Sequence, residues 1–336
     1  MMRIPLNPAQ LRASWLDRTM IMAVVLLSSV FPVELFPYTS PAVKGLDGQY
    51  SGKQGQVLVV TVKGEVQATE VTGTFLDRTI PFFREFRPGE PAGYVGLVGI
   101  DMQDDPGTHE LVVEVKQGEQ TKQLSFNVLV SKEKFTVEHL TLPKDKVDLD
   151  KKAVARWKTE QMQVKLALTE NSRLKLWHSN FVEPVNGKRT GIFGSVRIMN
   201  GKPRNPHNGE DIGAPMGADV VATNDGIVRI TVDHIFSGRG VFLDHGLGFY
   251  SMYFHLSEIV VKDGDLITAG QIIGKVGATG RATGPHLHWG VKLNGARVNP
   301  YALLNLPFKN GVVPAINLST PISATISIPE TGHVAQ

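Results

Sequence analysis

Short apolar runs separated by turn-forming residues dominate the chain between residues 44 and 132. These runs are rich in β-branched residues and cover 56–62, 110–118 and 123–130. In the last run apolar and polar residues alternate, which is typical of a strand with one buried face. Stretches that contain glycine and proline separate the runs. The pattern therefore predicts a β-sandwich-like accessory domain over 44–132.

The spacing of apolar residues changes over 145–173, where they recur every three or four positions among lysine and glutamine. This spacing predicts a linking helix, which Asp148 or Asp150 can cap at its start. Short apolar runs with Gly, Asn and Asp turns return over 174–304 and predict one compact antiparallel β domain. No period holds over 305–336, so we expect a mainly β protein that ends in a loosely ordered tail.

The first 42 residues show the pattern of an export signal. Basic residues accompany an unbroken run of apolar and small residues over 20–30, which is shorter than the membrane span of about 20 residues. We predict a signal peptide over 1–42 that is cleaved after Ala42, since Ser40 and Ala42 are small residues at suitable positions. An uncleaved signal anchor and a buried N-terminal helix are the alternatives. Export predicts a periplasmic or envelope location, with membrane attachment only if the segment stays uncleaved.

Composition and charge remove several classes of function. The 336 residues, of which 42% are hydrophobic and 20% charged, are sufficient for two folded domains. The net charge of +3, from 35 basic and 32 acidic residues, provides no electrostatic basis for nucleic-acid binding. The absence of cysteine excludes disulfides, iron–sulfur clusters, thiolate zinc sites and a cysteine nucleophile. The ten histidines are then the candidate metal ligands and acid–base groups.

Two histidines that lie two residues apart, His286 and His288, are the strongest local sign of chemistry. Residues at i and i+2 on a strand point to the same face, so a strand over 286–293 would direct both side chains toward one site. The alternative is a pair of half-buried histidines that hydrogen-bond to their neighbours without metal binding or catalysis.

A second pair, His207 and Asp211, lies four residues apart in a segment interrupted by Pro206, Gly209 and further glycines and prolines. Such a segment cannot form an ordinary helix, so the two side chains must converge through a loop that runs into a strand. A third candidate, His255, lies in an alternating aromatic strand. Taken alone, His255 is interpreted as a buried core histidine.

Taken together, these residues contain a catalytic zinc set. Two neutral imidazoles and one carboxylate leave the fourth position of zinc for water. The site keeps a charge of about +1, so zinc remains a strong Lewis acid and lowers the pKa of its water toward about 7. Two further histidines are suited to proton transfer, because the imidazole pKa lies near neutral pH. Spacing does not decide which of His286 and His288 is the ligand.

Three segments, HNGED (207–211), YFHL (253–256) and GPHLHWG (284–290), follow one another in an order that resembles the M23 family of zinc metallopeptidases. This family includes the lysostaphin and LytM-type peptidoglycan endopeptidases. The resemblance extends over roughly 185–303, and the ordered triple of motifs is very specific. It implies an M23-type catalytic fold for the C-terminal domain. The N-terminal β module resembles accessory domains that precede such peptidases.

By position in these motifs, the resemblance implies one Zn²⁺ per chain with His207, Asp211 and His288 as ligands. It implies that His255 and His286 are catalytic, polarising the water and stabilising the tetrahedral intermediate. The expected substrates are peptide cross-links or stem peptides of bacterial peptidoglycan, and the N-terminal β module is a candidate docking site for an envelope protein. A Gly–Gly bridge and a direct D-Ala–diaminopimelate cross-link both stay open as the bond cut, with a preference for the second.

Two other interpretations belong to different classes of function. A catalytically silent adaptor of the same fold would bind peptidoglycan or activate another cell-wall hydrolase; it is disfavoured because all five motif residues are present. A biotinyl or lipoyl carrier is disfavoured because Lys275 lies inside a predicted strand instead of at a hairpin tip. Zinc hydrolases of the HExxH type are excluded, since that string does not occur.

Overall fold

The computed structural model describes residues 49–65, 67–85, 93–142, 150–169 and 172–306. The predicted signal peptide over 1–42 lies outside the described residues, and so does the predicted tail over 305–336 apart from its first two residues. Among the described residues, no helix has the length and apolar character that crossing a membrane requires. The described part of the chain is mainly β, as the hydrophobic pattern predicts.

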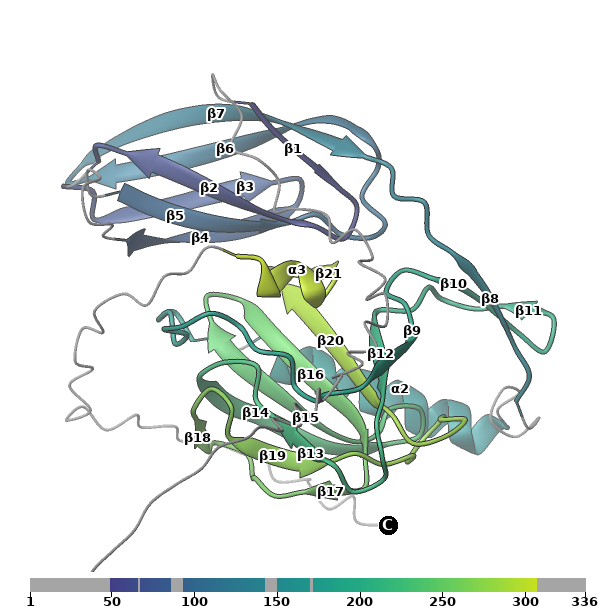
Figure 1. Ribbon diagram of the computed structural model, residues 1–336. Coiled ribbons are helices and arrows are strands. Elements are labelled where there is room, and N and C mark those ends of the chain that lie inside the picture. The colour runs from purple at the N-terminus through teal and green to yellow at the C-terminus, as the bar shows by residue number, and fades with distance from the viewer. Residues whose placement is uncertain (1–48, 66, 86–92, 143–149, 170–171, 307–336) are drawn as a thin grey trace, which may run out of the picture. The chain divides into compact units, whose positions relative to one another are not determined.

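Seven strands form the N-terminal sheet, in the order β1-β7-β6-β3-β4-β5-β2 (Figure 1). They are β1 (Gln49–Lys53), β2 (Val57–Lys63), β3 (Glu70–Phe75), β4 (Arg78–Glu85), β5 (Gly93–Gly99), β6 (Gly107–Gln117) and β7 (Gln120–Ser131). Neighbouring strands are antiparallel except β1 and β7, which are parallel. Over 124–130 every second side chain of β7 is more buried than its neighbours, so the predicted alternation is confirmed. All seven strands contribute to one apolar core.

The segment that follows the N-terminal sheet adds a short strand and a helix. The strand β8 (Val137–Leu140) pairs in parallel with β10 (Val196–Met199), and β10 pairs with β11 (Lys202–Pro203). The helix α2 (Lys151–Ala167) begins after Asp150, whose carboxylate accepts a hydrogen bond of 2.7 Å from a first-turn N–H. Apolar side chains near its C-terminal end pack on the C-terminal sheet. The connecting segment is thus paired, through β8, with β10, which lies before the HNGED motif in the chain.

An eight-stranded antiparallel sheet forms the C-terminal domain, in the order β18-β14-β15-β16-β20-β12-β9 with β21 beside β20 (Figure 1). Its strands are β9 (Lys188–Gly191), β12 (Gly209–Gly213), β14 (Gly226–His234), β15 (Gly238–Gly246), β16 (Phe249–Leu256), β18 (Leu266–Ile267), β20 (Leu287–Leu293) and β21 (Ala296–Val298). A second sheet contains β13 (Asp219–Val221), β19 (Ile272–Lys275) and β17 (Glu258–Ile259), and the short helix α3 spans Tyr301–Leu304. Residues of both sheets share one apolar cluster, so the two sheets pack as one domain.

The register of β20 with its two neighbours decides which side chains meet. Asp211 on β12 lies opposite His288, and Phe254 on β16 lies opposite the same histidine from the other side. His286 precedes β20 and forms an isolated bridge with Gly277. The predicted strand over 286–293 therefore begins one residue later than expected, within the usual uncertainty of a strand end.

A buried ion pair joins the end of β5 to β21. The carboxylate of Asp101 accepts hydrogen bonds from the guanidinium of Arg297 at 2.6 and 2.9 Å and from its backbone N–H at 2.7 Å. The backbone N–H of Gln103 donates to the same carboxylate at 2.8 Å. Burial would raise the pKa of Asp101, but these hydrogen bonds hold it below its usual value. Every contact of this carboxylate is thus with an N–H donor.

Candidate metal centre

Three of the five predicted site residues bring their donor atoms together. Nε2 of His207 lies 3.0 Å from Oδ1 of Asp211, and Nδ1 of His288 lies 2.9 Å from the same oxygen. The two imidazole nitrogens are 2.9 Å apart. All three residues are buried. The loop that carries His207 therefore converges with the strand that carries Asp211, as the spacing of the pair predicts.

Backbone hydrogen bonds hold the loop before β12 on both sides of His207. Its N–H donates to the carbonyl of Ser195 at 2.9 Å, and its carbonyl accepts from the N–H of Gly194 at 2.7 Å. Two residues later, Gly209 passes so close to His288 that an added Cβ would lie 2.6 Å from Nε2 of that histidine. Because only glycine leaves room for the imidazole here, the glycine of the HNGED motif has a steric role.

The hydrogen bonds of the His207 ring decide where its proton lies. Nδ1 of His207 lies 3.1 Å from the carbonyl oxygen of Ile192, and a carbonyl can only accept. The neutral ring therefore carries its proton on Nδ1 and directs the lone pair of Nε2 at Oδ1 of Asp211. A lone pair that faces a carboxylate oxygen at 3.0 Å is repelled unless a cation lies between the two atoms.

The donor set fits a zinc ion. Tetrahedral zinc holds nitrogen and oxygen ligands at about 2.0–2.1 Å, which separates two neighbouring ligand atoms by roughly 3.3 Å. The three edges of the donor group, at 3.0, 2.9 and 2.9 Å, are a few tenths of an ångström shorter than that separation. Two imidazoles and one carboxylate also match the nitrogen and oxygen ligands found in catalytic zinc sites.

An ion pair that the sequence analysis did not identify holds the second carboxylate oxygen of Asp211. Oδ2 accepts a hydrogen bond of 2.6 Å from the guanidinium of Arg197, which also contacts Glu138 at 3.2 Å. Glu138 lies opposite Arg197 in the pairing of β8 with β10. Because a guanidinium stays charged, the ion pair with Arg197 holds the carboxylate of Asp211 in its ionised form. The carboxylate is therefore ionised, with Oδ1 directed toward the two imidazoles.

The two predicted catalytic histidines lie beside this donor group. His255 lies within an irregularity in the pairing of β15 with β16 and has a φ of 64°, a left-handed conformation that is unusual outside glycine. Its Nδ1 donates to the carbonyl of Thr279 at 2.8 Å, and Nδ1 of His286 donates to the carbonyl of Gly284 at 2.8 Å. The two ring centres are 4.7 Å apart. In the neutral form, Nε2 of each ring is therefore a proton acceptor.

The structure separates the two histidines that spacing alone left equivalent. Nδ1 of His288 belongs to the donor group, whereas Nε2 of His286 lies 3.8 Å from Oδ1 of Asp211. Burial, and then the neighbouring rings of His288 and His286, lower the pKa of His255 to about 3. His255 is therefore neutral near pH 7, with the lone pair of Nε2 available as a hydrogen-bond acceptor.

A second buried ion pair stabilises the strand that carries Asp211. Glu210 is fully buried, and the guanidinium of Arg189 donates to its carboxylate at 2.6 and 3.1 Å. The same guanidinium lies 4.5 Å from the ring centre of Tyr301. Burial raises the pKa of Glu210, and the contact with Arg189 opposes this shift. The HNGED motif thus contains two neighbouring carboxylates, of which only that of Asp211 joins the donor group.

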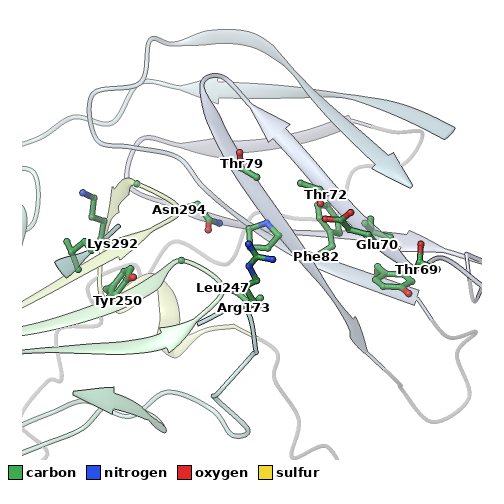
Figure 2. A pocket seen from close by; sticks show the side chains of 16 residues that line it. Thr69, Glu70, Thr72, Thr79, Phe82, Arg173, Leu247, Tyr250, Lys292 and Asn294 are labelled. Atoms are coloured by element: carbon green, nitrogen blue, oxygen red, sulfur yellow. The ribbon is translucent and has the colours of Figure 1, made fainter. Parts of the chain in front are cut away.

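A pocket with a different lining is also present. Figure 2 shows the side chains around it, among them Arg173, Tyr250 and Lys292. None of the five predicted site residues is among the residues that line this pocket. The histidine–aspartate group is therefore a separate feature, and the chemistry described above does not depend on this pocket.

A family model and several known proteins match the chain. The model of peptidase family M23 matches residues 205–300, a range that contains all five predicted site residues. The chain is 42% identical over 107 residues to the peptidoglycan DD-endopeptidase ShyA of Vibrio cholerae serotype O1, which covers 32% of this chain and 25% of ShyA. It is 39% identical over 97 residues to the DD-carboxypeptidase/endopeptidase Mpg of Neisseria meningitidis serogroup B, which covers 29% of this chain and 22% of Mpg. The chain thus spans about a quarter of the length of these curated relatives.

One solved structure matches a larger part of the chain. It is a Pseudomonas aeruginosa protein described as a peptidase M23, with 31% sequence identity and a TM-score of 0.58. The match covers 75% of this chain and 94% of that protein. The similarity therefore extends well beyond the residues that the family model matches.

Proposed function

The chain belongs to peptidase family M23, and from this premise we propose that it is a zinc-dependent endopeptidase that hydrolyses peptide cross-links or stem peptides of bacterial peptidoglycan. ShyA is named a peptidoglycan DD-endopeptidase and Mpg a DD-carboxypeptidase/endopeptidase, which supports a cell-wall hydrolase. One observation carries the proposal: the donor atoms of His207, Asp211 and His288 converge beside two further histidines whose Nε2 atoms accept protons.

His207, Asp211 and His288 would hold one Zn²⁺ ion through Nε2, Oδ1 and Nδ1 respectively. When bound, the ion would supply Lewis-acid polarisation of a water molecule and of the peptide carbonyl. The proton of His207 on Nδ1 is held by the carbonyl of Ile192, which keeps Nε2 available as a ligand. Arg197 holds Oδ2 of Asp211, so that the carboxylate offers its other oxygen to the ion.

The two remaining histidines transfer protons in this proposal. Because Nδ1 of His255 and of His286 each donates to a backbone carbonyl, Nε2 is the atom that takes up a proton. One ring accepts the proton of the attacking water as the new C–O bond forms, and returns it to the amide nitrogen as the C–N bond breaks. A ring protonated on Nε2 also donates to the negative charge of the tetrahedral intermediate and stabilises it.

The proposal includes export, because peptidoglycan lies outside the cytoplasmic membrane. The basic and apolar pattern of residues 1–42 supports it. N-terminal sequencing of protein recovered from the cell envelope tests this part. A mature chain that begins at Val43 is expected, and an intact Met1 on the exported protein would contradict cleavage.

Incubation of the purified protein with isolated peptidoglycan sacculi, with and without a zinc chelator, tests the activity. Mass spectrometry of the released material is expected to show chelator-sensitive cleavage of peptide bonds, and the fragment masses identify the bond. The His286→Ala variant is the matched control, since it should bind zinc and release little. If protein with its full complement of zinc releases nothing, the result contradicts an active enzyme and favours a latent enzyme or the adaptor.

A further inference from the structure

A half-buried arginine, Arg281, lies in the loop that supports both proposed catalytic histidines. Thr279, whose carbonyl accepts from His255, lies two residues before Arg281, and Gly284, whose carbonyl accepts from His286, lies three residues after it. Two residues of chain span at most about 7 Å. The backbone of Arg281 therefore lies within about 7 Å of Thr279 and about 11 Å of Gly284, whose carbonyls orient the catalytic rings.

Contacts with Phe236 hold Arg281, and none of the residues that the structure describes accepts a hydrogen bond from its guanidinium. The backbone N–H of Arg281 donates to the carbonyl of Phe236 at 2.8 Å, and the guanidinium carbon lies 4.1 Å from the centre of the Phe236 ring. That ring packs in turn against Trp157. Within the described ranges, neither a hydrogen-bond acceptor nor a carboxylate pairs with this guanidinium. A guanidinium held by stacking, with its donors available, is suited to bind a planar anion.

The charges around Arg281 also favour an anion. Burial, and then the neighbouring charges of Arg204 and Arg197, lower the pKa of Arg281 to about 10, so the side chain stays charged at neutral pH. The N–H of Arg204 donates to the carbonyl of Arg197 at 2.9 Å, which places both on the hairpin of β10 and β11. Asp211 and Glu138 balance the charge of Arg197. Like charges that gather beside a catalytic centre raise its positive potential and attract an anionic substrate.

We propose that Arg281, with the charge of Arg204 beside it, binds a free carboxylate of the peptide substrate. This inference rests on the proposed function and names the substrate class: peptides that carry a free carboxylate on the carbon bonded to the leaving nitrogen. A D-Ala–diaminopimelate cross-link has such a carboxylate, whereas a glycine bridge has none. The planar guanidinium donates two parallel hydrogen bonds to a carboxylate, and a carboxamide cannot accept both.

Two synthetic cross-linked peptides test the proposal, one with the free carboxylate and one with a carboxamide in its place. The zinc-loaded full chain is assayed as wild type, Arg281→Ala, Arg281→Lys and Lys262→Ala. Lys262 is exposed, so its variant controls for the loss of one positive charge elsewhere on the surface. We expect Arg281→Ala to lower kcat/KM about 10- to 100-fold for the carboxylate peptide and less than about 2-fold for the carboxamide peptide.

The conservative variant and the second peptide separate binding from packing. Arg281→Lys should recover part of the loss, because lysine keeps the charge but lacks the planar fork. Lys262→Ala should leave kcat/KM for both peptides unchanged. Equal losses on both peptides in Arg281→Ala would overturn the proposal, since lost packing on Phe236 would act on both substrates alike.

A binding measurement distinguishes failure of this proposal from failure of the proposed function. Both peptides are titrated by calorimetry into the zinc-loaded His286→Ala variant, with and without Arg281→Ala. The carboxylate peptide is expected to bind about 10-fold or more tightly than the carboxamide peptide, and Arg281→Ala to make the two Kd values equal. If wild-type protein cleaves neither peptide, the proposed function fails, while the two Kd values still decide the carboxylate site. Equal Kd values of the two peptides for the His286→Ala variant that retains Arg281 would overturn the proposed carboxylate site.

Discussion

The N-terminal sheet and the C-terminal domain differ in what they bury. Among the described residues of 49–142, which contain the N-terminal sheet, Asp101 is the one charged or polar residue that is buried. The described residues of the C-terminal domain bury a larger polar set: Ser195, His207, Glu210, Asp211, Thr223, Asn224, His234, Asp244, His245, Ser251, His255 and His288. Burial of polar groups costs free energy unless they are paired, so such a concentration is expected where chemistry requires it. The N-terminal sheet thus has the interior of a structural module, whereas the C-terminal domain has the buried polar groups that chemistry requires.

Two buried aspartates make the same difference visible at the level of atoms. Asp101 contacts N–H donors alone, from Arg297 and Gln103, so its charge is fully compensated within the fold. Asp211 has one oxygen held by Arg197, while the other faces the unprotonated Nε2 of His207. A carboxylate whose contacts are all N–H donors needs no further partner, whereas one that faces an imidazole lone pair requires a cation.

The largest expected effect separates these two aspartates. Asp211→Ala removes a proposed ligand, so zinc content should fall from about one ion per chain to almost none and peptide release should be lost. His207→Ala should behave in the same way. Asp101→Asn leaves the donor group untouched and should retain its zinc. Metal analysis of the purified variants measures this, and full zinc in Asp211→Ala would refute its role as a ligand.

Substitution of the proton-transferring histidines should affect turnover without affecting the metal. We expect His286→Ala and His255→Ala to keep their zinc and to lose about 100-fold or more in rate. Initial rates on sacculi, measured beside zinc content, test this division of roles. Loss of zinc from His286→Ala would instead assign this histidine to the metal.

Substitution of Asp101, the buried carboxylate of the N-terminal region, should change the stability of the protein. In Asp101→Asn the guanidinium of Arg297 loses its charged partner, so the free energy of unfolding should fall. Because the Arg297 side chain is 32% exposed, water compensates part of the loss, and the expected fall is about 2–3 kcal/mol. Denaturant unfolding measures the change. Glu70→Gln, which breaks the exposed pair with Lys116, is the matched control and should change little. An unchanged free energy of unfolding in Asp101→Asn would show that the pair of Asp101 with Arg297 is not needed for stability.

The smallest expected effect is a pH dependence that arises from His245 in the C-terminal domain. The ring of His245 is buried, and burial lowers its pKa to about 4. Its Nδ1 donates to the carbonyl of Asp225 at 2.6 Å, and its Nε2 accepts from the hydroxyl of Ser251 at 2.7 Å. As the pH falls, His245 therefore takes up its proton near pH 6.5 in the unfolded chain and only near pH 4 in the folded chain. As the pH falls from 7 to 5, the free energy of unfolding should decrease by at most about 2 kcal/mol from this group.

Denaturant unfolding of the wild type and of His245→Gln at both pH values measures that contribution. The variant lacks the titrating ring, so its stability should depend less on pH. The same slope in both proteins would show that other groups cause the pH dependence.

Much of the C-terminal domain follows from its sequence pattern. The aromatic strand predicted around His255 is β16, and the predicted convergence of His207 with Asp211 is confirmed by the 3.0 Å between their side chains. Both predictions depend on neighbours in the chain: apolar periodicity in the first case, and prolines and glycines that exclude a helix in the second. The predictions for residues 1–42 stay untested, because they lie outside the described residues.

Contacts that depend on strand pairing were not predicted. Glu138 and Arg197 are far apart in the sequence, and only the pairing of β8 with β10 brings them together beside Asp211. The motif resemblance implied His288 as the ligand, but spacing left His286 and His288 equivalent, and the register of β20 with β12 is what places His288 opposite Asp211. Neither pairing has a local signal, because the order of strands in a sheet is set by contacts between distant segments.

The sequence by itself determined the mainly β class, the positions of most strands and the five residues that carry the proposed chemistry. These properties are local, since hydrophobic period and side-chain type belong to each segment alone. Only the tertiary structure decided how Arg197 holds the carboxylate of Asp211, and that the guanidinium of Arg281 stacks on Phe236 without an acidic partner among the described residues. Such arrangements require backbone segments to meet at a defined register, and that register is a property of the folded chain as a whole.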